Sequence, residues 1–227
     1  MNLLIKKLNM KIGIFTITLN RLYYNYHCLK SLKNNAVVPF EQIIVDNGST
    51  DGSYEWLKEE GFNVIRNEEN KGISFASKQG YDWLVKKGID IIIKVDSDCE
   101  FISPSTLEAI NEFFSVNALQ KEPSKYVVSP VVKGITNSPP AGPKEVLGKF
   151  NIQRIGYIGG IFRAMRIQDF TEAMSQSKGL NDKPLNAYFT ANKFKVGYMS
   201  DLIVNHFETT KGQEKRYPEY FNKEYIF

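Results

Sequence analysis

The chain has 227 residues, 42% of them hydrophobic and 13% aromatic, which is enough to bury a sizeable core as one domain or as one domain with a small annex. The formal net charge of +4 is modest, and no basic block resembles a nucleic-acid-reading motif, so we expect no nucleic-acid partner. No apolar run approaches the roughly 20 residues of a membrane-spanning helix, and residues 1–9 lack the pattern of a signal peptide, so we expect a cytoplasmic protein without a transmembrane segment; peripheral contact at the inner face of a membrane stays open.

Strands and helices alternate through residues 10–102. Short apolar runs predict strands over residues 11–18, 41–46, 62–67 and 89–95, and leucines or aromatics at helical intervals predict helices over residues 22–34 and 74–87, with a shorter helix ending at Glu60. Gly61 and Gly88 follow two of these helices in the position of a C-terminal cap. The alternation predicts right-handed crossovers and a mostly parallel sheet with helices on both faces, a Rossmann-like three-layer α/β/α sandwich.

Residues 103–206 are less regular. We expect helices over residues 103–116, 167–177 and 184–194 and strands over residues 126–132, 155–163, 195–199 and 202–206, whereas residues 137–143 are rich in proline, glycine and small side chains. Residues 207–227 are polar and aromatic with weak periodicity, which indicates a tail or a lid. Cys28 and Cys99 form no metal-ligand spacing, so we expect free thiols and no zinc site.

The apolar run at residues 89–95 ends in two carboxylates one residue apart, Asp96 and Asp98. Carboxylates suit hard divalent cations such as Mg²⁺ and Mn²⁺, and ligands of open α/β sheets bind beyond the carboxyl ends of the strands. The pattern therefore predicts a site for a metal ion and a diphosphate. A polar turn after a strand has the same pattern, and the motif by itself does not decide between the two.

Further segments occur in the order found in one known family. Residues 17–21 (Ile-Thr-Leu-Asn-Arg), 43–51 (Ile-Ile-Val-Asp-Asn-Gly-Ser-Thr-Asp) and 70–72 (Asn-Lys-Gly) precede the acidic pair, and residues 159–163 (Gly-Gly-Ile-Phe-Arg), Asn181-Asp182 and His206 follow it. With these segments the chain resembles the inverting GT-A glycosyltransferases of family 2 over roughly residues 10–206. Two positions depart from the family pattern: Ala76-Ser77-Lys78 stands where many relatives have Ala-Arg-Asn, and Asn181 replaces the usual Glu.

The resemblance implies a GT-A fold with a nucleotide-sugar-binding half at residues 10–102 and an acceptor-binding half at residues 103–206. It implies a metal-dependent inverting glycosyltransferase, with a UDP-sugar as the expected donor and Asp182 as the general base. The implied metal ligands, for Mn²⁺ or Mg²⁺, are Asp98, His206 and Asp96. The implied nucleotide-binding residues are Thr18, Asn20, Arg21, Asp46, Asn47, Lys71, Asp96 and Ser97, and the implied acceptor-side residues are Gly159 and Gly160.

By the same resemblance, the acceptor would be a glycan, a lipid-linked molecule or a protein, in the biosynthesis of a surface glycan or polysaccharide. The short chain without membrane spans favours the addition of a single sugar over processive synthesis.

Several of these residues also have a purely structural reading. A lone histidine at a strand end, such as His206, is commonly just hydrogen-bonded, and lone basic residues are commonly surface charges. Asp182 ahead of Lys183-Pro184 suits the N-cap of a helix. Gly48 and Gly52 belong to dipeptides that form turns wherever they occur.

Rival functions fail at particular positions. A haloacid-dehalogenase-type phosphatase needs Thr or Val two residues after the second Asp, where Glu100 stands, and an EF-hand needs Gly where Phe101 stands. Nucleotidyltransferases of related fold need a glycine-rich loop after the first strand, and Leu19-Asn20-Arg21-Leu22 is not one. A non-catalytic sugar-nucleotide-binding protein of the same fold stays open, although the acidic pair, Asp182 and His206 argue against it.

Overall fold

The computed structural model describes residues 10–135 and 141–207, so the expectations for residues 1–9, for residues 136–140 and for a tail or lid after Phe207 lie outside the described part. The strands are β1 (Ile12–Thr18), β2 (Phe40–Asp46), β3 (Val64–Arg66), β4 (Ile91–Val95), β5 (Cys99–Phe101), β6 (Tyr126–Lys133), β7 (Ala141–Leu147), β8 (Phe150–Ile155), β9 (Phe162–Arg166) and β10 (Lys195–His206). The helices are α1 (Leu22–Asn35), α2 (Ser53–Glu59), α3 (Ile73–Lys86), α4 (Thr106–Ala118), α5 (Ile167–Gln176) and α6 (Asp182–Ala191).

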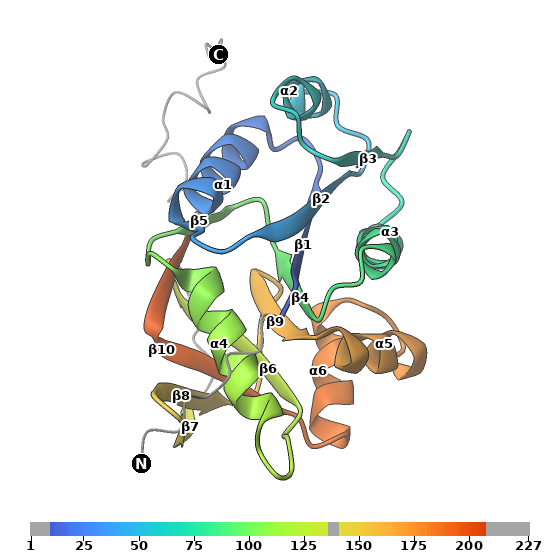
Figure 1. Cartoon of the computed structure of the whole chain (residues 1–227). Coiled ribbons are helices and arrows are strands. Elements are labelled where there is room, and N and C mark those ends of the chain that lie inside the picture. The colour runs from blue at the N-terminus through green and yellow to red at the C-terminus, as the bar shows by residue number, and fades with distance from the viewer. Residues whose placement is uncertain (1–9, 136–140, 208–227) are drawn as a thin grey trace.

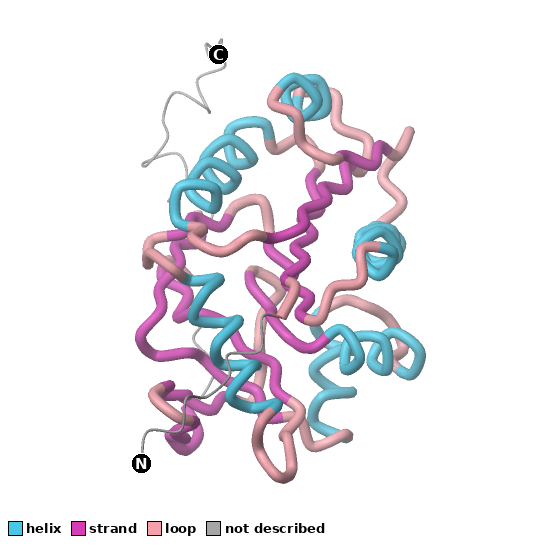
Figure 2. The backbone as a smooth tube through the Cα atoms, in the orientation of Figure 1, coloured by secondary structure: helices cyan, strands magenta, loops and turns pink. Residues whose placement is uncertain are grey.

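One sheet runs through the described chain, with helices against both of its faces (Figure 1). Its strands are hydrogen-bonded in the order β3-β2-β1-β4-β9-β6-β10-β8-β7, and β5 pairs with β10. The backbone trace shows β1, β2 and β4 passing through the middle of the molecule between the helices (Figure 2). The predicted α/β class, with a sheet between two helical layers, is confirmed. None of the described helices is long and apolar enough to cross a membrane.

The first half of the sheet is parallel, as predicted. β1 lies between β2 and β4 and runs in the same direction as both, and β2 pairs with β3 in the same sense. Helix α3 packs closely on β1 because Gly80 has no side chain: a Cβ atom there would lie 2.9 Å from the Cβ atom of Phe15.

The direction of pairing changes at β9, which runs antiparallel to both β4 and β6. The strand predicted over residues 155–163 is wrong, because β8 ends at Ile155 and β9 begins only at Phe162. The loop between them contains Gly156, Gly159 and Gly160, and glycine weakens a strand by its conformational freedom and its lack of a side chain to pack.

Four further strands differ from the expectation. β7 and β8 form an antiparallel hairpin around Gly148 that was not predicted, although a short connection containing glycine is a hairpin signal. The short strand β5 was also not predicted, and it pairs with the end of β10. The two strands expected over residues 195–206 form the single strand β10, whose pairing with β6 shifts register between Met199 and Ile203.

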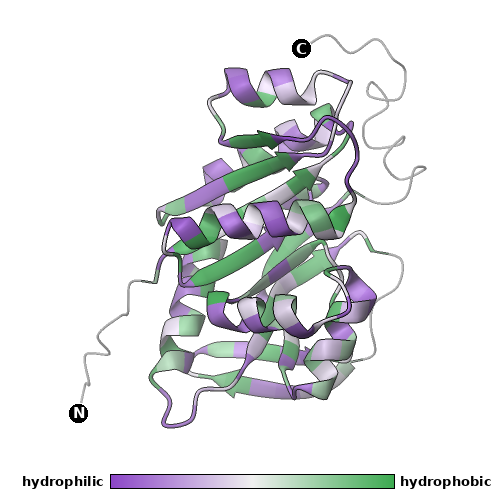
Figure 3. Cartoon of the chain, turned by 90° about the vertical axis from the view of Figure 1, so that its right-hand side faces the viewer, coloured by the Kyte–Doolittle hydropathy of each residue, from purple (hydrophilic) through white to green (hydrophobic). Residues whose placement is uncertain are grey.

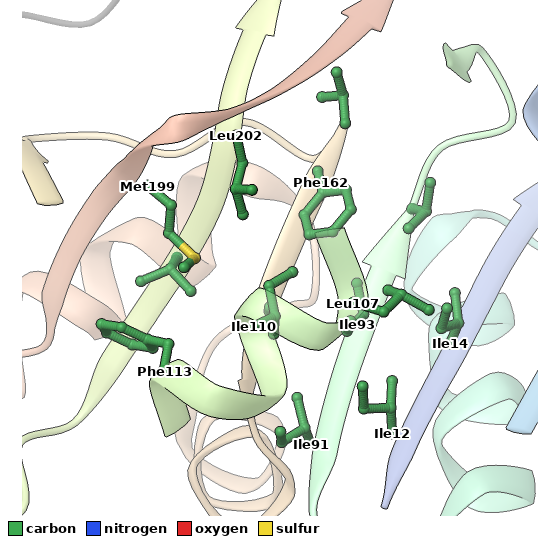
Figure 4. Close-up of a cluster of buried hydrophobic side chains, with 14 of the residues drawn as sticks. Ile12, Ile14, Ile91, Ile93, Leu107, Ile110, Phe113, Phe162, Met199 and Leu202 are labelled. Atoms are coloured by element: carbon green, nitrogen blue, oxygen red, sulfur yellow. The ribbon is translucent and has the colours of Figure 1, made fainter. Parts of the chain in front are cut away.

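The core has two main parts, one on each face of the sheet. Along β4 the side chains alternate: Ile91 and Ile93 belong to the cluster under α1 and α4, whereas Ile92 belongs to the cluster under α3, α5 and α6. Figure 4 shows the first cluster, with Ile12, Ile14, Ile91, Ile93, Leu107, Ile110, Phe113, Phe162, Met199 and Leu202 labelled. Coloured by hydropathy, the chain carries much of its hydrophobic sequence on the strands, whereas the visible faces of the helices are mixed (Figure 3). Cys28 and Cys99 are buried free thiols, as expected.

Candidate active site

Segments from both halves of the chain meet at one edge of the sheet. β1, β2 and β4 are parallel, so Thr18, Asp46 and the turn of residues 96–98 all lie at their carboxyl ends. Because β9 is antiparallel to β4, the loop that leads into β9 reaches the same edge. The backbone amide of Asp96 donates a hydrogen bond to the carbonyl oxygen of Ile161, 2.8 Å away, which joins the acidic turn to that loop.

The pairing of β5 with β10 brings His206 to the acidic turn. His206 lies opposite Cys99, and its Nε2 atom is 3.6 Å from Oδ1 of Asp98. Arg21 lies on the other side of the same carboxylate, with Nη1 3.6 Å from Oδ2. Burial by itself raises the pKa of Asp98, but hydrogen bonding to His206 and the charges of His206 and Arg21 outweigh it and lower that pKa below its ordinary value. The structure thus brings together two of the three predicted metal ligands.

Asp98 and His206 fit a divalent cation. A carboxylate oxygen and an imidazole nitrogen are suitable ligands for Mn²⁺. Two adjacent ligands of an octahedral ion with bonds of about 2.1 Å lie about 3 Å apart, so a separation of 3.6 Å needs only a small adjustment. Among the described residues no three His, Cys, Asp or Glu side chains converge on one point, so oxygens of a bound ligand and water would have to complete the coordination. Asp96, the third predicted ligand, is paired with Lys94 instead.

A cavity of about 450 Å³, here called the first cavity, lies at this edge of the sheet. Of the predicted nucleotide-binding residues, those that line it are Thr18, Arg21, Asn47, Asp96 and Ser97. Its other lining residues are Ile17, Leu19, Asn70, Gly72, Ile73 and Asp98. The cavity therefore joins the ends of β1 and β2 to the acidic turn.

Three predicted nucleotide-binding residues do not line the first cavity. The side chain of Asp46 is fully buried, its carboxylate accepts a hydrogen bond from the backbone amide of Ser49 at 3.3 Å, and its burial raises its pKa. Asn20 has a positive φ of 51°, and its Oδ1 accepts a hydrogen bond from the amide of Thr50 at 2.7 Å, so it shapes the turn after β1. The ammonium group of Lys71 pairs with Glu69 at the surface.

A network of amide side chains, which the sequence did not reveal, holds Asn47 in place. Its Nδ2 donates to Oδ1 of Asn70 at 2.7 Å, and its Oδ1 accepts from Nδ2 of Asn67 at 3.0 Å and from the backbone amide of Lys71 at 3.1 Å. Gln79 of α3 extends the network by donating to Oδ1 of Asn67 at 2.9 Å. Networks with satisfied partners are rigid, so this wall of the first cavity is preorganised.

A second cavity, of about 480 Å³, shares Ile73 and Asp96 with the first. It lies between the start of α3, the loop before β9 and the start of α6. Its remaining lining residues are Ser77, Lys94, Tyr157, Gly160, Arg163, Leu180, Asn181, Asp182, Lys183 and Pro184. Asp96 therefore stands where the two cavities meet.

Asp182 is held in the second cavity by two contacts. Its Oδ2 accepts a hydrogen bond from the backbone amide of Gly160 at 3.0 Å, and its Oδ1 lies 3.2 Å from Nη2 of Arg163. Burial and the nearby Asp182 charge raise the pKa of Tyr157, which lines the same cavity. The N-cap of α6 is Asn181, whose side chain makes no capping hydrogen bond, and Asp182 belongs to the first helical turn, so Asp182 does not have the N-cap role considered for it.

Two buried basic residues in this cavity had no predicted role. Lys94, on β4, contacts Oδ1 of Asp96 and donates to the carbonyl oxygen of Gly160 at 2.6 Å. Arg163, on β9, lies opposite Lys94 in the register of the two strands, and its Nη1 atom is buried without a hydrogen-bond partner among the described residues. The sequence did contain a signal for the role of Lys94, because it is a lysine inside an otherwise apolar strand. Lysine is almost never fully buried unless it is paired, so its position indicated a buried carboxylate partner.

Comparison with known proteins agrees with the resemblance seen in the sequence. A family model described as glycosyl transferase family 2 matches residues 14–160. The solved structure of S. aureus TarS 1–349 in complex with UDP-GlcNAc has a TM-score of 0.63 and 17% identity, and the match covers 96% of this chain and 62% of that one. The structure of GalNAc-T7 with UDP, GalNAc and Mn²⁺ has a TM-score of 0.69 and 14% identity, over 90% of this chain and 45% of that one. At these identities the two structures show the fold.

A curated protein from Klebsiella pneumoniae named sorbitol-6-phosphate 2-dehydrogenase is 26% identical over 187 residues, which are 82% of this chain and 62% of that protein. The chain thus spans less than two thirds of the length of each of these three proteins. A dinucleotide-binding site of the Rossmann type needs a glycine-rich turn after its first strand. Here that turn is Leu19-Asn20-Arg21, which contains no glycine.

Proposed function

Since the chain belongs to glycosyl transferase family 2, we propose that it is a metal-dependent inverting glycosyltransferase that moves a sugar from a nucleotide-sugar donor to a hydroxyl group of an acceptor. The observation that carries the proposal is the pair of cavities that meet at Asp96. The first contains the acidic turn and suits the nucleoside diphosphate, and the second contains Asp182 and suits the acceptor. A UDP-sugar is the proposed donor, because the similar TarS fold was solved with UDP-GlcNAc.

The donor half of the site must hold a diphosphate that leaves as an anion. We propose that Asp98 and His206 hold a Mn²⁺ or Mg²⁺ ion, as the Mn²⁺ in the structure of GalNAc-T7 suggests by similarity of fold. When bound, the ion supplies Lewis-acid stabilisation of the leaving diphosphate. Arg21, 39% exposed and within 3.6 Å of Asp98, adds a positive charge at the same cavity. Thr18 and Asn47 lie at the end of the cavity formed by β1 and β2 and are proposed to contact the nucleoside.

The acceptor half of the site needs one base. Asp182 accepts the proton of the acceptor hydroxyl while the oxygen bonds to the sugar carbon and the bond from that carbon to the diphosphate breaks, so the configuration at the carbon inverts in one displacement. The only other carboxylate among the described lining residues of the second cavity is Asp96, which lies at the junction with the first cavity and contacts Lys94. Asp182 lines only the second cavity, where Gly160 and Arg163 orient it, so it is the proposed base.

The lining of the second cavity suits a sugar acceptor. Tyr157 is 40% exposed at this cavity, and an aromatic ring of this kind can pack against the apolar face of a sugar. The unpartnered Nη1 of Arg163 favours an oxygen atom of a bound molecule, because a buried donor without a partner is costly. We therefore propose a glycan acceptor, free or linked to lipid or protein, in the biosynthesis of a surface glycan or polysaccharide.

The test begins with nucleotide binding. The melting temperature is measured with UDP, GDP, CMP and dTDP, each with and without Mn²⁺, because a ligand that binds the folded state raises it. One nucleotide, expected to be UDP, should stabilise the protein in a Mn²⁺-dependent way. The matching sugar nucleotides are then screened for transfer to glycan acceptors.

Two substitutions separate the proposed roles. Asp98→Ala should abolish the Mn²⁺-dependent part of the stabilisation. Asp182→Asn should keep it and reduce the transfer rate by about 10²- to 10⁴-fold, the usual contribution of a general base. The control is Asp82→Asn, which changes a half-exposed aspartate on α3 that pairs with Lys78 at the surface. Stabilisation by a nucleotide without turnover of any donor would indicate a non-catalytic binding protein, and near-normal transfer by Asp182→Asn would remove the base assignment.

A further inference from the structure

Lys94 is an unusual residue for its position. It lies in β4, at the centre of the sheet, where its neighbours Ile93 and Val95 are fully buried, and it is itself only 7% exposed. A charged side chain is retained in such a place only if it is paired, because removing a charge from water is costly. The ammonium group has two partners, the carboxylate of Asp96 and the carbonyl oxygen of Gly160.

A second buried cation faces the first. Arg163 occupies the position directly opposite Lys94 on β9 and is 6% exposed, and like charges in opposite positions of a strand pair destabilise a sheet. Two carboxylates offset this repulsion, Asp96 beside Lys94 and Asp182 beside Arg163. An apolar pair would stabilise the sheet more simply, so the four charges point to a role in the cavities that they line.

Gly160 connects the two charge pairs. Its carbonyl oxygen accepts a hydrogen bond from Lys94, and its amide donates one to Asp182. The contacts leave no room for a side chain: a Cβ atom on Gly160 would lie 2.8 Å from Oδ1 of Asp182 and 3.1 Å from Nζ of Lys94. A continuous series of polar contacts therefore runs from Asp96, at the junction with the first cavity, through Lys94 and Gly160 to Asp182 in the second.

We propose that Lys94 is a positioning residue that couples the two cavities. Its contact with Asp96, here called the Asp96 arm, fixes and neutralises that carboxylate beside the nucleotide. Its hydrogen bond to Gly160, here called the Gly160 arm, fixes Gly160 and, through it, the carboxylate of Asp182. The consequences for UDP binding and for transfer rate rest on the proposed function; the consequence for the geometry of Gly160 does not.

The test is a comparison of Lys94→Met in two backgrounds, the natural one and Asp96→Asn. Methionine keeps the length of the side chain without its charge. The double variant removes both charges of the buried pair, so we expect it to fold even if an unpaired Asp96 prevents folding of the single variant. The dissociation constant of UDP with Mn²⁺ and the kcat of transfer are measured for all four proteins. Lys78→Met, which removes a surface lysine that pairs with Asp82 on α3, is the matched control and should change neither quantity.

The two arms give different patterns. With Asp96 present, Lys94→Met should weaken UDP binding by about 10- to 100-fold, the usual effect of removing a group that orients a ligand-binding residue, because Asp96 is left as an uncompensated charge beside the diphosphate. In the Asp96→Asn background the same substitution should leave UDP binding unchanged. The kcat should fall about tenfold or more in both backgrounds, because Gly160 loses its contact in both.

Three results would overturn the coupling. Equal weakening of UDP binding in both backgrounds would remove the Asp96 arm, and an unchanged kcat in the Asp96→Asn background would remove the Gly160 arm. A crystal structure of the Lys94→Met protein that keeps the 3.0 Å contact between Gly160 and Asp182 would also remove it. If the natural protein binds UDP but transfers no sugar, the proposed function fails, while the UDP comparison and the crystal structure still decide the coupling.

Discussion

Replacing Gly160 by alanine adds one methyl group between the two charge pairs. Gly160 is not among the glycines with positive φ, so the backbone permits alanine, and the substitution acts through the methyl group alone. The new Cβ atom would lie 2.8 Å from Oδ1 of Asp182, whereas a close carbon–oxygen contact is about 3.3 Å or longer. The carboxylate must therefore move by about 0.5 Å, or the loop that carries Gly160 must move instead.

The size of the effect follows from that displacement. A misplacement of about 1 Å at a reacting group costs on the order of 100-fold in rate, so we expect Gly160→Ala to lower kcat by about 10- to 100-fold. UDP affinity should change less than kcat, because the added Cβ atom would lie closer to Oδ1 of Asp182, at 2.8 Å, than to Nζ of Lys94, at 3.1 Å. Crowding should also lower the free energy of unfolding by about 1–3 kcal/mol.

The assay is the rate of UDP release in the presence of donor and acceptor, with UDP affinity and the melting temperature measured on the same protein. Gly156→Ala is the matched control: it lies in the same loop, lacks a positive φ and has no atom within 4 Å of an added Cβ. A kcat for Gly160→Ala within twofold of the control would refute the reasoning, since it would mean that the position of Asp182 does not limit transfer. An equal loss of kcat in both variants would show that the loop tolerates no added side chain for reasons unrelated to Asp182.

Three further predictions follow from the contacts and charges. Gly80→Ala should lower the free energy of unfolding by about 1–2 kcal/mol in urea titrations, because the new methyl group crowds Phe15 at 2.9 Å and this outweighs the gain in helix propensity; a more stable variant would show that the contact relaxes. Burial raises the pKa of Asp169 to about 6, so its ionisation opposes folding, and the stability that it supports at low pH is lost as the pH rises from about 4 to about 6. Asp169→Asn should therefore be more stable than the natural protein at pH 7 by about 1–3 kcal/mol and gain less at pH 4.5, and a constant difference would contradict the assignment. His206→Ala should raise by about tenfold the Mn²⁺ concentration that is needed for UDP to stabilise the protein, without changing stabilisation by UDP alone. An unchanged dependence on Mn²⁺ would mean that His206 has only a structural role.

The predictions from sequence were most accurate where local pattern and chain direction decide the structure. In a parallel α/β sheet the carboxyl ends of the strands lie at one edge, so Thr18, which ends β1, and the acidic turn after β4 could be placed together without any long-range information. The burial of a side chain is harder to predict than its position at the sheet edge, because burial depends on which residues of other elements pack against it. Asp46 is also the last residue of a strand, but the turn containing Ser49 and the side chain of Arg66 cover it, and it does not line the first cavity.

The rest of the site depends on pairing between strands that are far apart in the sequence, and the sequence contains only weak signals for that pairing. His206 meets Asp98 because the short strand β5 pairs with the end of β10, and a three-residue strand is too short to show a periodic pattern. Arg163 faces Lys94 only because β9 is antiparallel to β4, a direction that no local pattern in residues 155–166 reveals. The roles of Lys94 and Arg163 were missed for this reason.

The reversal of direction at β9 also explains where the site lies. If β9 were parallel to β4, the loop that enters it would reach the opposite edge of the sheet, and Gly160 could not meet the turn that follows β4. Because β9 is antiparallel to β4, the loop that leads into β9 lies beside the turn that follows β4. The amide of Asp96 therefore donates a hydrogen bond directly to the carbonyl oxygen of Ile161. The first cavity lies among the parallel strands and the second beside the reversed one. Their junction at Asp96 is thus a consequence of topology, and so is the position of Lys94 and Arg163, which lie opposite each other on these two strands and both line the second cavity.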